Sequence, residues 1–171
     1  MDGRLLVNAV AYYIDWSDIQ LNSFDFDTFA NRNQNIGEAE IFGLETEIRY
    51  QVTENLQLSM NYSYIDATLA EDFMGATVDR STTPPTVTEF VAAAEGERLP
   101  GSSKDTFSFF ADWHMPLTSS LDLQVNANYV YVGSRPNDIG SLSLGVPLGR
   151  KIPNSQITNL TAGISHDNGV T

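Results

Sequence analysis

The sequence predicts an all-β fold, a segment of an antiparallel transmembrane β-barrel with about six long strands, short periplasmic turns and long extracellular loops. Three observations lead to this prediction. Apolar and polar residues alternate with a period of two, each run outlasts the roughly five or six residues of an ordinary strand, and aromatic residues stand at the ends of the apolar faces. Strands of about 9–11 residues with these features are typical of outer-membrane barrels.

The clearest alternation predicts two adjacent strands, Gly37–Gln51 and Leu56–Thr68, joined by a short turn at Val52–Asn55. Successive side chains of a strand point to opposite faces, so every second residue shares a face. We expect the mainly apolar face to meet lipid, here called the first face, and the mainly polar face to meet the lumen, here called the second face. The first carries Phe42, Leu44, Thr46, Ile48, Tyr50, Leu56, Leu58, Met60, Tyr62 and Tyr64, and the second carries Gly43, Glu45, Glu47, Arg49, Gln51, Gln57, Ser59, Asn61 and Ser63.

The first predicted strand, Arg4–Leu21, is ambiguous in its facing. Asn8 is polar and favours the lumen for its own face, which leaves the odd-numbered residues from Leu5 to Tyr13 for lipid. Tyr12, Ile14 and Trp16 share the face of Asn8 and favour the reverse assignment. Both facings are therefore open from the sequence.

Three further strands are expected at Thr106–Met115, Leu121–Tyr131 and Gln156–Ser165. The connections between the six strands alternate strictly in length, and in bacterial barrels the short ones are periplasmic and the long ones extracellular. The long loops are Asn22–Gln34, Leu69–Ser103 and Gly133–Ser155, and the short turns are Val52–Asn55, Pro116–Ser120 and His166–Gly169. Proline cannot donate to a strand ladder, so the pair Pro84–Pro85 is expected outside any central strand.

The composition of the chain excludes several classes of function. Only 18% of its 171 residues are charged, against roughly 25% in soluble domains, and no apolar run reaches the length of a transmembrane helix. The absence of cysteine excludes disulfides. A net charge of −13 argues against nucleic-acid binding, which needs a basic face. Acidic residues concentrate at the end of the first strand and in the long loops. These loops are either solvated or bind cations, at a lipopolysaccharide surface or in a substrate vestibule.

No constellation in the sequence predicts catalysis. Glu45 and Glu47 share one strand face with Arg49, which fits a lumen wall better than an acid–base pair. His114 and His166 lack partners at the spacing of a metal site. Neither a nucleophile elbow nor a phosphate-binding glycine loop is present. We therefore expect no enzyme, no catalytic or metal-binding residue and no cofactor.

The first long loop contains the candidate ligand contacts. Apolar residues exposed on a loop need a physical reason, and ligand contact is one such reason. Packing over the barrel rim is the alternative. The candidate residues are Phe24, Asp25, Phe26, Asp27, Phe29 and Arg32.

Three motifs resemble the C-terminal barrel portion of a TonB-dependent outer-membrane receptor. Asn35–Glu47 resembles the family strand N-x-G-x-A-x-x-x-G-x-E-x-E, and Asn8–Gln20 is similar to its aromatic strand F-Y-x-D-[YW]-x-D. Gly96–Gly101 resembles the G-x-R-L-P step that precedes another strand. The three motifs occur in the family's order and spacing, and the resemblance spans nearly the whole chain.

The resemblance implies a barrel of roughly 22 strands around an N-terminal plug, which imports a siderophore, cobalamin or sugar with energy delivered by TonB. The sequence begins without a signal peptide, so we expect residues 1–171 to be a partial barrel domain without the plug and the last two strands. The implied partners are outer-membrane lipid, lipopolysaccharide, the rest of the barrel and plug, TonB and a small-molecule nutrient. The alternatives are a segment of a passive porin or a soluble β-sandwich binding module.

Overall fold

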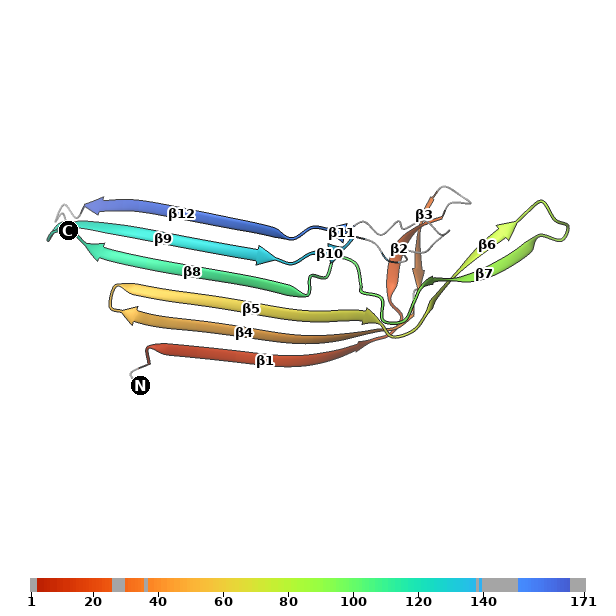
Figure 1. Cartoon of the computed structure of the whole chain (residues 1–171), viewed down its shortest axis with the longest axis horizontal. Helices are drawn as coiled ribbons and strands as arrows, with labels where there is room; N and C mark the ends of the chain where they lie inside the picture. The colour runs from red at the N-terminus through yellow and green to blue at the C-terminus, as the bar shows by residue number, and fades with distance from the viewer. Residues whose placement is uncertain (1–2, 26–29, 36, 138, 140–150, 167–171) are drawn as a thin grey trace.

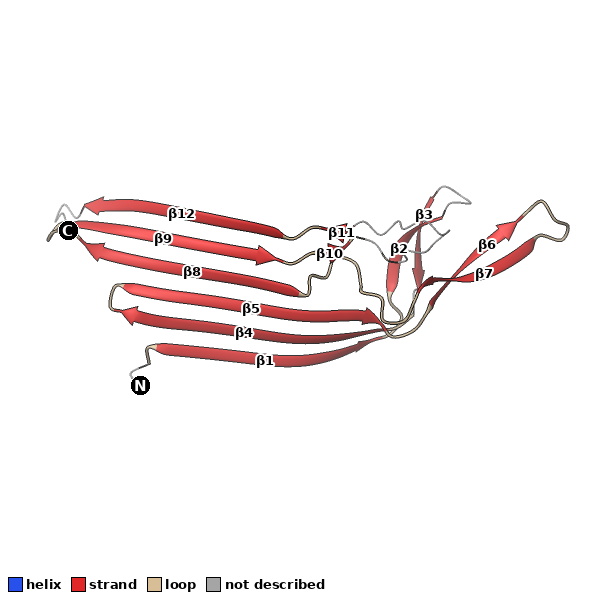
Figure 2. Ribbon diagram, in the orientation of Figure 1, coloured by secondary structure: helices blue, strands red, loops and turns tan. Residues whose placement is uncertain are grey.

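The computed structural model describes residues 3–25, 30–35, 37–137, 139 and 151–166. These residues form one six-stranded antiparallel sheet and three two-stranded hairpins (Figures 1 and 2). Figure 1 shows the short turns at one end of the sheet and the hairpins at the other. Within the described ranges, no helix has the length and apolar character needed to cross a membrane.

The six long strands follow one another in the sheet in the order in which they occur along the chain, each antiparallel to its neighbours. The sheet is therefore an antiparallel meander, which confirms the predicted antiparallel arrangement of six long strands. The strands are β1 (Leu5–Trp16), β4 (Ala39–Thr53), β5 (Leu56–Leu69), β8 (Asp105–Pro116), β9 (Leu121–Val132) and β12 (Ser155–His166).

The sequence located five of these strands to within two residues at each boundary, but the prediction for the first was wrong. A continuous strand was expected from Arg4 to Leu21, whereas β1 ends at Trp16. The chain turns at Asp18, which has a φ of 57°. Aspartate is one of the few residues other than glycine that adopt this left-handed conformation. The Asp18 carboxylate accepts a hydrogen bond from the Asn35 amide at 3.0 Å, which links the turn to a residue far along the chain.

The sequence analysis assigned no strand to the long loops, but each of them contains a hairpin. The second hairpin is the longest, and Pro84 and Pro85 lie in its turn, outside both strands, as predicted. Figure 1 shows it projecting beyond the other elements. The hairpins pair β2 (Gln20–Asp25) with β3 (Ala30–Asn35), β6 (Phe73–Asp79) with β7 (Thr86–Ala93), and β10 (Arg135–Pro136) with β11 (Lys151–Ile152).

Register with β4 decides the facing of β1. Directly paired residues of an antiparallel sheet share a face. Val7 pairs with Ile48 and Tyr13 pairs with Phe42, so the odd-numbered residues of β1 join the apolar face. Asn8 pairs with Glu47 on the polar face. Of the two facings that the sequence left open, the one favoured by Asn8 is observed.

Tyr12 occupies the polar face because β4 leaves space for its ring. It pairs with Gly43, and a Cβ atom added to Gly43 would overlap the Tyr12 ring. The missing side chain of Gly43 thus lets an aromatic ring lie close against the neighbouring backbone. This local fit explains how Tyr12, an aromatic residue, is accommodated on the polar face.

The polar face becomes apolar toward the hairpins and is covered there. We call the buried residues at this end the mouth cluster: Ile19, Ala39, Ala67, Leu69, Ala93 and Leu99. Four partly buried side chains pack against it, namely Ile41, Ile65, Phe73 and Ile139. The cluster joins the outer ends of β4 and β5 to Ile19, which follows β1, and to Ala93 and Leu99 of the second long loop. These residues cover the outer end of the polar face.

The chain returning from the β6–β7 hairpin extends the pairing of β5. β8 itself pairs with β5 only between Leu56 and Tyr64. Beyond that point, backbone N–H groups of Leu69 and Leu99 bond across the gap, Leu69 to the carbonyl of Glu97 and Leu99 to that of Ala67, both at 2.9 Å. The base of the second long loop is therefore part of the sheet.

The contact between Tyr12 and Gly43 predicts a difference between two glycines of the polar face. Gly43→Ala forces the Tyr12 ring to move and should lower the free energy of unfolding by about 1 kcal/mol. Gly163→Ala is the matched control, because no atom lies within 4 Å of its added Cβ, and its effect should stay within about 0.5 kcal/mol. Denaturant titration measures both, and equal costs would contradict the packing described.

Candidate functional site

The polar face carries hydrogen-bonded side chains that link β1 to β4. The Asn8 amide donates to Glu47 Oε2 at 3.0 Å, and the Arg49 guanidinium contacts Glu47 Oε1 at 3.2 Å. The side chains of Arg49 and Glu47 are 54% and 38% exposed, so this ion pair adds little stability. It does offset the charge of Glu47 within a surface of mainly neutral polar groups.

Amides and hydroxyls continue this surface across the sheet. The Asn61 amide of β5 donates to Ser108 Oγ of β8 at 3.2 Å. The Asn159 amide of β12 donates to Asn128 Oδ1 of β9, also at 3.2 Å. Such groups bind water without the cost of isolated charge. The face is therefore suited to line an aqueous space.

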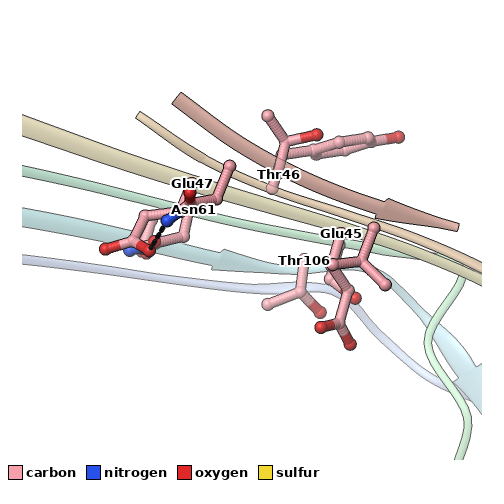
Figure 3. A pocket seen from close by; sticks show the side chains of 10 residues that line it. Glu45, Thr46, Glu47, Asn61 and Thr106 are labelled. Atoms are coloured by element: carbon pink, nitrogen blue, oxygen red, sulfur yellow. Dashed lines mark hydrogen bonds between the residues drawn. The ribbon is translucent and has the colours of Figure 1, made fainter. Parts of the chain in front are cut away.

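A shallow hollow of about 360 Å³ lies over the centre of this surface. Figure 3 shows Glu45, Glu47, Asn61 and Thr106 on one side of the sheet and Thr46 on the other. The two glutamates are thus exposed as the predicted wall residues would be, with hydroxyl and amide groups as their neighbours.

A second hollow, of about 420 Å³, lies at the end of the sheet that carries the hairpins. Its polar lining comes from the turn after β1, the chain entering β4 and the chain leaving β5: Asp18, Asn35, Gly37, Glu38, Glu71 and Asp72. The Gly37 N–H donates to Asn35 Oδ1 at 3.0 Å, and Gly37 adopts a φ of 96°. Four carboxylates give this hollow a negative lining, which disfavours a strongly anionic ligand.

Three of the six predicted ligand-contact residues lie in the first hairpin. Phe24 and Asp25 belong to β2 and Arg32 belongs to β3. Phe26, Asp27 and Phe29 lie outside the described residues. Register places Arg32 opposite Ser23 and Phe24 opposite Asn31, so the three described positions share one small sheet.

Sequence reasoning missed both the acidic hollow and the mouth cluster. The available signal for the cluster was the apolar character of Ile41 and Ile65, which interrupt the polar face near its outer end. No comparable signal marked the hollow, because Asp18, Glu38 and Glu71 come from three segments that only the tertiary fold brings together.

The opposite face of the sheet is apolar and uncovered. Val7 and Tyr13 of β1 are 55% and 60% exposed, and Leu160 and Ile164 of β12 are 75% and 69% exposed. Soluble proteins rarely expose an apolar surface that is continuous across a whole sheet. This face therefore requires an apolar environment.

Aromatic rings mark both ends of the apolar face, as the alternation predicted. Tyr50 and Trp113 lie toward the short turns, near the pairs that close β4–β5 and β5–β8. Toward the hairpins, the rings of Phe42 and Tyr64 meet edge to face with centroids 6.4 Å apart. Amphipathic rings prefer the two interfaces of a bilayer.

Charged groups appear on this face immediately beyond the outer aromatic rings. Lys104 Nζ lies 2.8 Å from Asp66 Oδ2 and 5.9 Å from the centroid of the Tyr64 ring. The Tyr62 hydroxyl donates to Asp105 at 2.7 Å. The apolar band thus ends at a layer of paired charges and tyrosine hydroxyls, as expected where hydrocarbon gives way to head groups.

Two other titratable sites lie at the ends of the molecule. His114 Nε2 is 3.7 Å from Asp122 Oδ1 beside the β8–β9 turn, and no group of three or more possible metal ligands occurs among the described residues. At the far end of the β6–β7 hairpin, the hydroxyl and backbone N–H of Ser81 donate to Asp79 and hold the pKa of that carboxyl below its usual value.

A meander of long strands with an exposed, aromatic-bordered apolar face and a polar opposite face defines the wall of a transmembrane β-barrel. The family model described as "TonB dependent receptor-like, beta-barrel" matches residues 1–171. The chain therefore belongs to the TonB-dependent receptor family, a family of outer-membrane transport receptors rather than enzymes. A search of curated proteins gave no match.

Proposed function

We propose that this chain is part of a bacterial outer-membrane receptor that actively imports a scarce nutrient, of the siderophore, cobalamin or sugar class, by TonB-dependent transport. The observation that carries the proposal is the family match over all 171 residues, on a sheet with one lipid-compatible face and one polar face. In this arrangement the polar face lines the lumen, the short turns are periplasmic and the hairpins are extracellular.

The edges of the sheet support a larger assembly. Among the described residues, β1 and β12 each pair with one long strand only. An unpaired strand edge is not tolerated in lipid, because its backbone groups find no hydrogen-bond partner there. We propose that further strands pair with both edges to close the barrel around a plug, so that residues 1–171 are a partial barrel domain.

The proposed partners follow from this placement. Membrane lipid meets the apolar face, and lipopolysaccharide meets the layer of Lys104, Asp66 and Tyr64 at its outer end. TonB would act through an N-terminal plug region. The nutrient would first meet the extracellular hairpins, and the proposed contacts are Phe24, Asp25, Phe26, Asp27, Phe29 and Arg32.

Energy dependence separates this proposal from passive diffusion. Deleting the gene for the complete receptor should abolish uptake of one labelled probe among a ferric siderophore, cobalamin and a maltooligosaccharide. Adding a protonophore to wild-type cells should abolish the same uptake, because TonB transmits energy from the inner membrane. Receptor-dependent uptake that persists with the protonophore would instead identify a porin.

The ligand contacts can be tested in the same uptake assay. Arg32→Ala should raise the concentration for half-maximal uptake by about 10- to 150-fold with little change in maximal rate, since loss of a hydrogen bond to a charged group costs roughly 1.5–3 kcal/mol. Arg80→Ala, in the turn of the β6–β7 hairpin, removes an equal charge elsewhere and serves as control. Equal effects of the two changes would remove Arg32 from the proposed contacts.

The facing of β5 predicts a large difference between neighbouring substitutions. Met60 pairs with Ile48 and Phe109 on the apolar face, whereas Asn61 pairs with Glu47 and Ser108 on the polar face. Met60→Arg should lower the unfolding free energy by about 2–4 kcal/mol, and Asn61→Arg by about 1 kcal/mol or less. Denaturant titration of the complete receptor in lipid vesicles measures both. A larger cost at Asn61 would mean that the barrel is inside out.

A further inference from the structure

β1 is apolar on both of its faces. Its odd-numbered residues from Leu5 to Tyr13 join the apolar face of the sheet, and its even-numbered residues reach the polar face. Of the even-numbered residues, only Asn8 is neither aliphatic nor aromatic. We call the other five the inner stripe: Leu6, Val10, Tyr12, Ile14 and Trp16. A strand that is apolar on both faces is typical of a strand that is covered on both faces.

The position of β1 at an edge of the sheet does not explain the inner stripe. In the middle of the sheet, the polar face of β5 has no apolar side chain from Gln57 to Ser63. β12 lies at the opposite edge and has a single apolar residue on the polar face, among Ser155, Ile157, Asn159, Thr161, Gly163 and Ser165. The inner stripe is therefore a particular property of β1.

Within the described part of the chain, the inner stripe is largely uncovered. Leu6, Val10 and Trp16 are 44%, 55% and 48% exposed, and Val10 lines the hollow over the centre of the polar face. A further strand at the free edge of β1 pairs in the plane of the sheet, so it shields one flank of these side chains and leaves their inward surface open. An apolar surface of this extent needs a physical reason. Its cover must lie on the polar side of the sheet.

The inner stripe is too long for one small ligand. From Leu6 to Trp16 the strand rises roughly 33 Å, at about 3.3 Å per residue. A compact ligand that fills a pocket of about 1,000 Å³ is only roughly 12 Å across. A cover that extends along the whole stripe is therefore a protein surface.

The described loops reach only the outer end of the inner stripe. Trp16 pairs with Ala39, which is fully buried in the mouth cluster. Val10 and Leu6 lie progressively further from that cluster, toward the short turns (Figure 1). The turn between β4 and β5 leaves only Glu54 and Asn55 outside the strands, too few to fold back over β1. The apolar cover that begins at the mouth cluster must be continued by another part of the receptor.

We propose that the inner stripe of β1 is the packing surface for the plug domain, which places an apolar surface along most of this strand. The assignment rests on the proposed function, because it requires a barrel with a domain inside it. It confines the aqueous part of the lumen to the wall from β4 to β12, where amide and hydroxyl groups line the surface. The nutrient then passes along those strands and not along β1.

Cysteine labelling of the complete receptor on intact cells tests whether protein covers the stripe. Residues 1–171 contain no cysteine, and any cysteine elsewhere is replaced by serine. Val10→Cys should react slowly with both a charged thiosulfonate and an apolar, membrane-permeant maleimide. Asn61→Cys, on the polar face of β5, should react with the charged reagent at least about tenfold faster, because a covered thiol reacts only when its contact opens. Val7→Cys, on the apolar face of β1, should react with the apolar reagent only.

The three positions separate failure of this assignment from failure of the proposed function. Fast reaction of Val10→Cys with the charged reagent would show that water covers the stripe, and fast reaction with the apolar reagent alone would show that lipid covers it. Either result would overturn the assignment, although a contrast between Asn61→Cys and Val7→Cys would still support the barrel. Equal reaction of Val7→Cys and Asn61→Cys with the charged reagent would contradict the membrane placement itself.

Photo-cross-linking identifies the covering protein. With p-benzoylphenylalanine in place of Val10 in the complete receptor, irradiation of intact cells should join β1 to a peptide of the plug domain, which mass spectrometry of the digest identifies. The same replacement of Asn61 is the matched control and should give several-fold less of this product. A cross-link from position 10 to an extracellular loop or to another protein, or no cross-link at all, would overturn the assignment.

Discussion

The hydrogen-bond ladder between neighbouring strands is the constraint on which this structure depends. Lipid offers no partner for a backbone N–H or carbonyl, so each membrane-crossing strand must satisfy its groups on the strands beside it. The ladder also fixes which side chains share a face, and a slip by one residue would exchange the apolar and polar faces of a strand. Pairing Tyr13 with Phe42 and Asn8 with Glu47 therefore determines both the lipid surface and the polar surface of β1 and β4.

The long strands could be predicted because their two faces meet different solvents, which imposes a strict two-residue period on the sequence. β5, from Leu56 to Leu69, shows this most clearly. The end of β1 could not be predicted, because the strand stops at a left-handed turn at Asp18 that does not interrupt the alternation. The facing of β1 could not be predicted from its own sequence, because it depends on the neighbouring strand β4. The missing side chain of Gly43 on β4 leaves the space that the Tyr12 ring occupies.

The candidate site was less accessible to sequence reasoning than the barrel wall. Glu47 and Asn61 could be assigned to the polar face from periodicity alone, and register confirms that they pair. The acidic hollow at the mouth joins Asp18, Glu38 and Glu71, which are far apart in the chain. The hairpins were missed because their strands are short and mix polar with apolar residues. Whether Phe24 and Arg32 contact a ligand stays a prediction.

The way the second loop joins the sheet has a consequence for how such receptors diversify. Residues 97–104 continue the ladder along β5, so changes there would disturb the wall itself. Among the described residues, β6 and β7 beyond them pair with each other in a separate two-stranded sheet. Insertions, deletions and recombination at the hairpin can therefore accumulate without loss of membrane assembly. The outer surface can therefore change in sequence while the paired strands beneath it stay the same.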